Sequence, residues 1–203
     1  MASKDRILRQ KEETKTSILD AAYAIVKEEG WEGLNMRKIA DRIEYTAPII
    51  YEHFSNKLAI LQELSNKGFL TLSHKLKDAE QSHTDPTLRL EAMWIAFWNF
   101  AFENKELYQV MYGVEMKCCA EFFASNSDNP YNLLNNAIKA VMKEEQPTDM
   151  EVKLKYYTFF SVIHGLISIN LIGNGLADNT NEQIFKDAVN AIINSLHTGK
   201  LTP

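Results

Sequence analysis

The chain has 203 residues, of which 45% are hydrophobic and 24% charged, and a net charge of -5 at pH 7. This length and apolar fraction suffice for a packed core and exclude a disordered chain. No apolar run approaches the roughly 20 residues of a membrane span, and the start lacks a secretion-signal pattern, so we expect a cytoplasmic protein. Residues 1–57 hold ten basic and ten acidic side chains, so the excess negative charge falls on residues 58–203.

Apolar residues recur every three or four positions, and no stretch alternates as a half-buried strand does. This periodicity predicts an all-α fold of about nine or ten helices, with Asn35, Thr46 and Asp149 as N-caps. Gly30 and the segment Gly173 to Gly175 are the expected helix stops. The expected helices are about Arg9 to Glu29, Met36 to Ile43, a short helix after Thr46, Lys57 to Glu80, Thr87 to Glu103, Lys105 to Tyr112, Met116 to Ala124, Tyr131 to Glu145, Met150 to Ile172 and Asn181 to Leu196.

The second and third expected helices are short, and only Glu44 and Tyr45 separate them. Two short helices joined by so tight a turn, and braced by a longer helix, form a helix-turn-helix. Ile50 and Phe54 are four residues apart, so both should face the core of this unit. The rest of the third helix is then left to face outward.

We expect a helix-turn-helix domain at residues 1–56 and a larger helical domain at residues 57–203. The polar loop from Gln81 to Pro86 is the best candidate for a break between packed units. The expected helix from Met150 to Ile172 is apolar nearly all round, and such a helix must be covered on every side. In a chain of this size, a partner subunit is the expected cover.

The segments Gly30 to Ala40 and Ile50 to Lys57 resemble the N-terminal domain of the TetR family of bacterial transcriptional regulators. The resemblance rests on the Gly-aromatic start, the Ile-Ala pair, Tyr-x-x-Phe and the terminal Lys, all in register. It implies a homodimeric, all-helical repressor that binds a palindromic operator and releases it when a small molecule occupies the C-terminal domain. Glu44 stands where the family often has Gly, and Thr46 to Pro48 replaces a Ser-Lys-Gly-like start of the third helix.

Two further segments, Glu106 to Tyr112 and Ile163 to Gly165, resemble a C-terminal subtype of the same family that is named for a Trp-His-Gly tripeptide. Here Ile163 replaces the Trp. The family also implies that the last two long helices of each subunit pack into a four-helix dimer interface.

We divide the expected DNA contacts into phosphate contacts and base-edge contacts, according to how far each side chain extends and which hydrogen bonds it can donate. Lys57 lies at a helix N-terminus, where charge and free N–H groups favour a phosphate. Arg37 suits a guanine edge or a phosphate, and a surface salt bridge is the alternative. Glu52 would accept a hydrogen bond from a cytosine amino group or form an ion pair with Lys38 or Arg42. The predicted DNA-binding residues are Arg37, Thr46, Ala47, Pro48, Ile49, Tyr51, His53 and Lys57, with the apolar ones against thymine methyl groups.

The many aromatic residues of the C-terminal part, together with a few polar groups, suggest a site for a hydrophobic small-molecule effector. Plain core packing is the alternative for each of these residues. The predicted ligand-binding residues are Trp94, Trp98, Tyr108, Met111, Tyr112, Phe123, Phe160 and His164.

The five His residues and the pair Cys118 and Cys119 show no zinc spacing, so we expect neither a metal nor a cofactor. No catalytic motif appears, so we expect no enzyme. Two other hypotheses stay open: a DNA-tethered interaction module controlled by a protein partner, and a redox switch through the cysteine pair.

Overall fold

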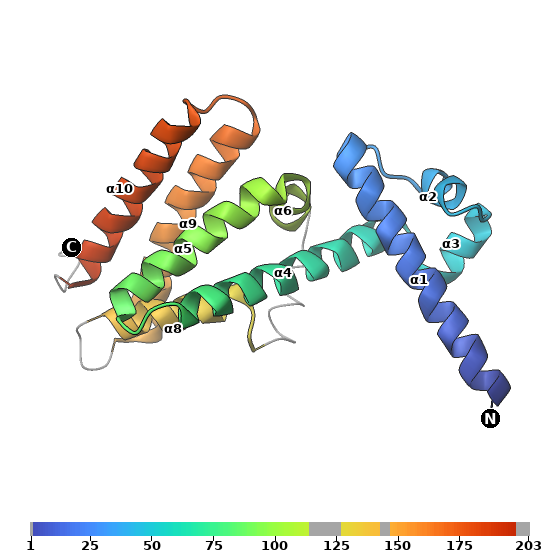
Figure 1. The fold of residues 1–203 in the computed structure, drawn as a ribbon, viewed down its shortest axis with the longest axis horizontal. Helices are drawn as coiled ribbons and strands as arrows, with labels where there is room; N and C mark the ends of the chain where they lie inside the picture. Colours follow the sequence, from blue (N-terminus) through green and yellow to red (C-terminus); the bar gives the residue numbers. More distant parts are fainter. Residues whose placement is uncertain (1, 114–126, 143–146, 198–203) are drawn as a thin grey trace. The chain divides into compact units, whose positions relative to one another are not determined.

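The computed structural model describes residues 2–113, 127–142 and 147–197 of the chain. Within these ranges it contains nine α-helices and no β-strand, which confirms the predicted all-α fold (Figure 1). The helix expected at Met116 to Ala124 lies outside the described residues. The helices are α1 (Ala2–Glu29), α2 (Met36–Arg42), α3 (Ala47–His53), α4 (Lys57–Gln81), α5 (Pro86–Glu103), α6 (Lys105–Tyr112), α8 (Pro130–Val141), α9 (Asp149–Leu171) and α10 (Asp178–His197).

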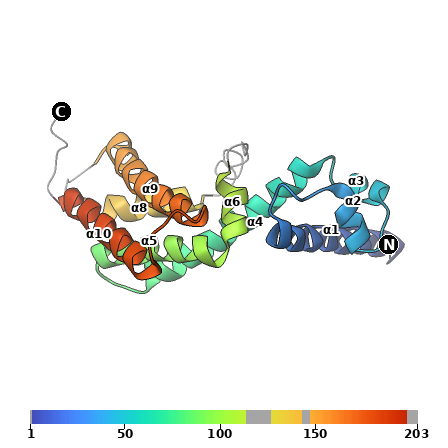
Figure 2. The same ribbon diagram turned by 90° about the horizontal axis from the view of Figure 1, so that it is seen from above.

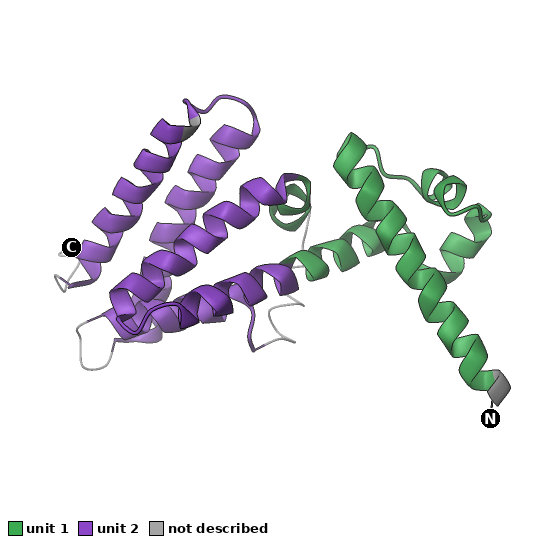
Figure 3. Cartoon of the chain, viewed as in Figure 1, with its two compact units in different colours: residues 1–68, 106–121 green, residues 69–105, 122–203 purple. Residues whose placement is uncertain are grey.

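The chain forms two compact units (Figure 3). Unit 1 comprises residues 1–68 and 106–121, and unit 2 comprises residues 69–105 and 122–203. The division does not coincide with the predicted boundary after residue 56, because the first half of α4 contributes buried side chains such as Leu61 and Leu64 to unit 1. The loop from Gln81 to Pro86 lies inside unit 2.

In unit 1, α1 begins at Ala2, earlier than the predicted start near Arg9. No Gly or Pro interrupts these residues, and the acidic Asp5 in the first turn suits the positive end of the helix dipole. The buried face of α1 starts only at Ile18. Gly30 ends the helix with a φ of +76°, a left-handed conformation that favours glycine.

The helix-turn-helix is formed by α2 and α3, which pack against each other. Asn35 caps α2, and its Oδ1 accepts a hydrogen bond from the backbone N–H of Lys38 at 3.0 Å. Thr46 occupies the N-cap position of α3, but its side chain makes no capping bond, contrary to the prediction. Pro48 lacks an N–H, and the N–H of Ile49 is already bonded to the carbonyl of Thr46 at 3.0 Å, so no donor remains for the hydroxyl.

Unit 2 packs α5, α8, α9 and α10 around one apolar core, with α9 and α10 side by side (Figure 1 and Figure 2). Thr148, and not the predicted Asp149, caps α9, because Glu151 three residues later completes a capping box with it. The helix expected to reach Glu145 ends at Val141. None of the described helices combines the length and apolarity that a bilayer crossing needs.

Candidate nucleic-acid interface and effector site

The two faces of α3 differ in exposure as the spacing predicts. Ile50 is fully buried and Phe54 is 5% exposed, which confirms that both belong to the core. Pro48 and Tyr51 are exposed, with 55% of the Tyr51 side chain open to solvent. The other outward-facing candidates, Ala47, Ile49 and His53, are half-buried.

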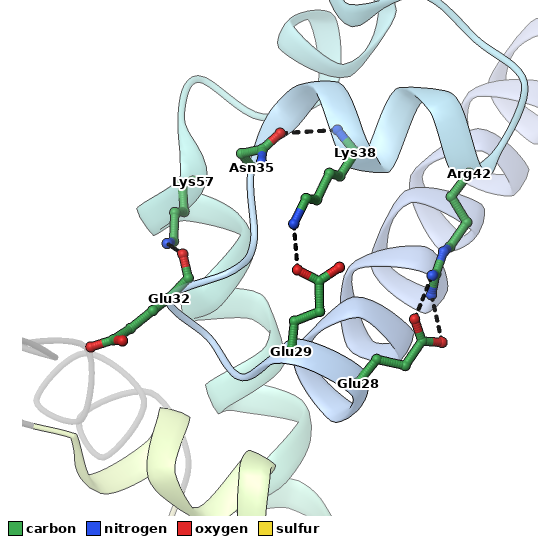
Figure 4. Close-up of polar contacts among 7 residues, drawn as sticks. All are labelled: Glu28, Glu29, Glu32, Asn35, Lys38, Arg42 and Lys57. Carbon is green, nitrogen blue, oxygen red and sulfur yellow. Dashed lines mark hydrogen bonds and ion pairs between the residues drawn. The ribbon is translucent and has the colours of Figure 1, made fainter.

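The last turn of α1 neutralises two cations of α2 (Figure 4). Arg42 donates from two nitrogens to Glu28, one of them at 3.0 Å, and Lys38 pairs with Glu29. The hydrogen bond from Arg42 holds the pKa of Glu28 below its ordinary value, and the same bond raises the pKa of Arg42. The alternative in which Glu52 pairs with Lys38 or Arg42 is therefore not observed in the described residues, because both cations pair with carboxylates of α1.

Lys57 does not point freely into solvent, as a dedicated phosphate ligand would. Its Nζ donates to the backbone carbonyl of Glu32 at 3.0 Å (Figure 4). It also lies 5.5 Å from the centroid of the Trp31 ring. Because a carbonyl does not neutralise the ammonium, Lys57 keeps its charge beside α3. Its phosphate contact stays a prediction.

Arg37 is exposed, and within the described part of the chain it forms no ion pair. The alternative of a surface salt bridge is thus not observed there. The side chains that sequence reasoning missed are Glu28 and Glu29, which decide which cations of α2 stay free. Their position directly before the helix stop at Gly30 was the available signal.

Three of the predicted effector residues come together in unit 2. Trp94 is fully buried and stacks on Phe159 of α9, with ring centroids 5.1 Å apart. Phe160 stacks on His164 at 5.2 Å, and Tyr156 contacts both Trp94 and Phe160. We call these five residues of α5 and α9 the aromatic cluster.

The aromatic cluster contains two polar rings, those of Trp94 and His164. Within the described residues, the buried Nε1 of Trp94 has no hydrogen-bond partner, although buried polar groups nearly always have one. Burial lowers the pKa of His164 and thereby favours the neutral form of its ring. The ring nitrogen Nε2 of His164 lies 3.5 Å from the Ser168 hydroxyl.

The other predicted effector residues lie elsewhere, so the set is not one site in unit 2. Trp98 stacks on Phe185 of α10 at 4.6 Å and lines a separate open groove of about 420 Å³. Tyr108, Met111 and Tyr112 belong to α6 in unit 1, where the two tyrosine rings are 4.7 Å apart. Phe123, like Cys118 and Cys119, is outside the described residues. Sequence spacing places these residues on helices but does not say which neighbours they meet.

Two family models match the chain. Residues 18–64 match the model described as bacterial regulatory proteins, tetR family, and residues 90–192, just over half of the chain, match the tetracyclin repressor-like C-terminal domain. The chain belongs to the TetR family. Its α2 and α3 are accordingly the helix-turn-helix of a TetR-family DNA-binding domain. The comparisons do not confirm the Trp-His-Gly subtype.

Curated TetR-family relatives include an activator and a repressor. The transcriptional activator FasR of Mycolicibacterium smegmatis is 28% identical over 102 residues, which are 50% of this chain and 47% of FasR. The transcriptional repressor KstR of Mycobacterium tuberculosis is 25% identical over 137 residues, which are 68% of this chain and 62% of KstR. The chain therefore spans about half to three fifths of the length of these relatives.

The fold is shared with solved structures. A protein of unknown function from Rhodococcus sp. RHA1 superposes with a TM-score of 0.74 at 21% identity, covering 91% of this chain and 95% of that one. At this identity the likeness establishes the TetR-family fold alone.

Proposed function

We propose that this TetR-family protein is a homodimeric transcriptional repressor that leaves a palindromic operator when a hydrophobic small molecule binds its C-terminal domain. The observation that carries the effector part is the buried Trp94 indole, whose Nε1 finds no acceptor within the described residues. The family supports the DNA-binding part.

On the DNA side, the exposed Pro48 and Tyr51, with the half-buried Ala47 and Ile49 beside them, form an apolar reading face. Such a face suits thymine methyl groups in the major groove. Thr46 keeps its hydroxyl free of capping and can donate it to a phosphate. Arg37, His53 and Lys57 complete the proposed contacts.

A second copy of the chain is the proposed cover for the apolar side chains that α9 and α10 leave in solvent. Exposed fractions reach 50% for Leu154, 39% for Val162 and 48% for Ile169 on α9, and 37% for Ile184 on α10. Apolar residues this exposed on neighbouring helices mark an interaction surface. In a twofold dimer, two recognition helices would then meet half-sites about 34–36 Å apart.

The effector class follows from the aromatic cluster. The apolar rings of the cluster favour an apolar molecule, while the Trp94 N–H requires a hydrogen-bond acceptor on it. The neutral ring of His164 supplies a further polar contact. To move the protein almost fully from one state to the other, the effector must prefer one state by about 5.5 kcal/mol.

Selection of bound duplexes from a random DNA pool by the full chain tests the DNA part. We expect one palindromic sequence to be enriched, and Tyr51→Ala to change which sequence is enriched. A second arm measures the melting temperature of the chain with a panel of hydrophobic carbonyl compounds, since a bound ligand stabilises the fold. A protein partner recovered by pull-down, without any stabilising compound, would instead support the DNA-tethered interaction module.

A further inference from the structure

The first four turns of α1 project from the packed helix-turn-helix domain. Residues 4–13 are all exposed, including Ile7 at 60% and Leu8 at 55%. The first buried side chain of α1 is Ile18, and the family match also begins at residue 18. In Figure 1 this start of α1 extends past α3 within unit 1. Residues 4–13 therefore lie outside both the matched range and the packed core, and core packing does not explain them.

One face of this projecting helix is basic. Lys4, Leu8, Lys11 and Lys15 follow at intervals of four, three and four residues, which places them on one stripe of a helix. Of the acidic side chains of the segment, Glu13 lies on the opposite side of the helix, whereas Asp5 and Glu12, three and four residues from Leu8, flank the stripe on one side. We call the four residues the α1 basic stripe. Its three lysines thus point to one side of the helix.

Lys15 shows which way the stripe faces. Its Nζ lies 5.8 Å from the ring centroid of Phe54, the C-cap residue of α3, and pairs with Glu63 of α4 at 3.4 Å. The stripe therefore continues, beyond the packed domain, the side of α1 that faces Phe54 at the end of α3 and Glu63 of α4. At about 1.5 Å per residue, Lys11 and Lys4 lie roughly 6 and 16 Å further along the helix axis. In the described part of the chain, neither of them forms an ion pair.

The family domain itself carries more negative than positive charge. Residues 18–64 hold five Lys and Arg against eight Asp and Glu, a net charge of -3. Of these cations, Lys38 and Arg42 are paired with carboxylates, and Lys57 is bonded to a carbonyl. Residues 1–17 hold five Lys and Arg against three Asp and Glu, a net charge of +2. Because phosphate neutralisation supplies much of the affinity of DNA-binding proteins, this positively charged segment can add to the contacts proposed for Arg37 and Lys57.

We infer that Lys4 and Lys11, with Leu8 between them, form a second DNA contact that lies along the phosphate backbone beside the bases that α3 reads. The lysines bind phosphates, and Leu8 contacts the deoxyribose edge. This inference rests on the proposed DNA-binding function and names a contact outside the helix-turn-helix. It commits to duplex DNA as the occupant, because charge complementarity favours a polyanion over a second copy of an acidic chain.

The test compares two double variants of the full chain with equal charge change. Lys4→Ala with Lys11→Ala removes the stripe lysines, whereas Arg6→Ala with Arg9→Ala removes two cations from the opposite side of the same helix. The probe is the duplex that the unmodified chain enriches from a random pool, with ten extra base pairs on each side. We expect the stripe variant to bind about tenfold more weakly at moderate salt and to lower the slope of log affinity against log salt by about two. The control variant should change affinity less than about twofold.

Equal losses in both variants would mean that the segment acts only through its overall charge, and no loss in the stripe variant would mean no contact; either result overturns the inference. So does a stripe variant that dissociates in analytical ultracentrifugation, because the stripe would then be an interface between copies. If the unmodified chain enriches a sequence and Tyr51→Ala changes it, the proposed function stands whatever the stripe does. Failure of the unmodified chain to enrich any sequence overturns both.

Discussion

Arg42 of α2 holds the carboxylate of Glu28, in the last turn of α1, through both terminal nitrogens of its guanidinium. Arg42 thereby loses its availability for a phosphate, although it belongs to the helix-turn-helix. The pair ties the end of α1 to α2. The acidic side chains at the end of α1 thus pair with two of the three cations of α2.

The pH dependence of this pair is the first prediction. The hydrogen bond from Arg42 lowers the pKa of Glu28 from its ordinary value of 4.5, so its contribution to stability is present above that value. The contribution is lost as the pH falls through the lowered pKa of the folded state. A carboxyl-carbon NMR titration should place the Glu28 midpoint below 4.5 in the unmodified chain and move it back upward in Arg42→Ala. Identical midpoints in the two proteins would show that the pair does not persist in solution.

A close helix contact in unit 1 carries the second prediction. A Cβ on Gly68 of α4 would lie 2.9 Å from the Cγ of Met111 and 3.1 Å from the Cγ of Leu107 on α6. Overpacking costs about 1–3 kcal/mol, while Ala is favoured over Gly within a helix by about 1 kcal/mol. We expect Gly68→Ala to lower the free energy of unfolding by about 1 kcal/mol, measured by urea denaturation.

A double-variant cycle provides the control for this contact. Met111→Ala opens the space beside Gly68, so the loss caused by Gly68→Ala should be smaller in that background than alone. Additive effects would place the cost of the added methyl group somewhere other than the contact between α4 and α6.

The third prediction concerns the exposed apolar residues of α9. Val162→Glu would bury a charge in the proposed dimer interface, so we expect the variant to be monomeric by analytical ultracentrifugation at concentrations where the unmodified chain is dimeric. Leu70→Glu on α4 is the matched control, since Leu70 is 45% exposed but lies on neither α9 nor α10. Dimers of the Val162 variant as stable as those of the control would argue against this interface.

Trp94 provides the fourth prediction. Trp94→Phe keeps an aromatic ring and removes the N–H, so an effector that accepts this hydrogen bond should bind about tenfold more weakly by calorimetry, near the 1.4 kcal/mol of one such bond. Trp98→Phe serves as the control, because Trp98 packs on Phe185 and not in the aromatic cluster. Equal losses from the two substitutions would remove Trp94 from the effector site.

Much of the helical pattern could be read from the sequence, because burial of one helix face imposes its spacing on the residues. Ile50 and Phe54, four residues apart, are both buried as predicted. The cap at Asn35 and the stop at Gly30 also follow from local backbone chemistry. The predicted cap of α9, Asp149, is one residue away from the observed cap, Thr148. The choice between them depends on the carboxylate of Glu151, which completes the capping box with Thr148.

By itself, the sequence determined the all-α class, the helix-turn-helix and the resemblance to the TetR family, since all of these depend on residue spacing within about twenty positions. Only the tertiary structure decided the partners of individual side chains. In it, Arg42 and Lys38 pair with carboxylates of α1, and Trp94 and Trp98 stack on different rings, Phe159 and Phe185. Lys4 and Lys11 lie on the part of α1 outside the packed domain. The physical reason is that helix periodicity records which face of a helix is buried, whereas the group that covers that face comes from a distant segment and leaves no periodic trace.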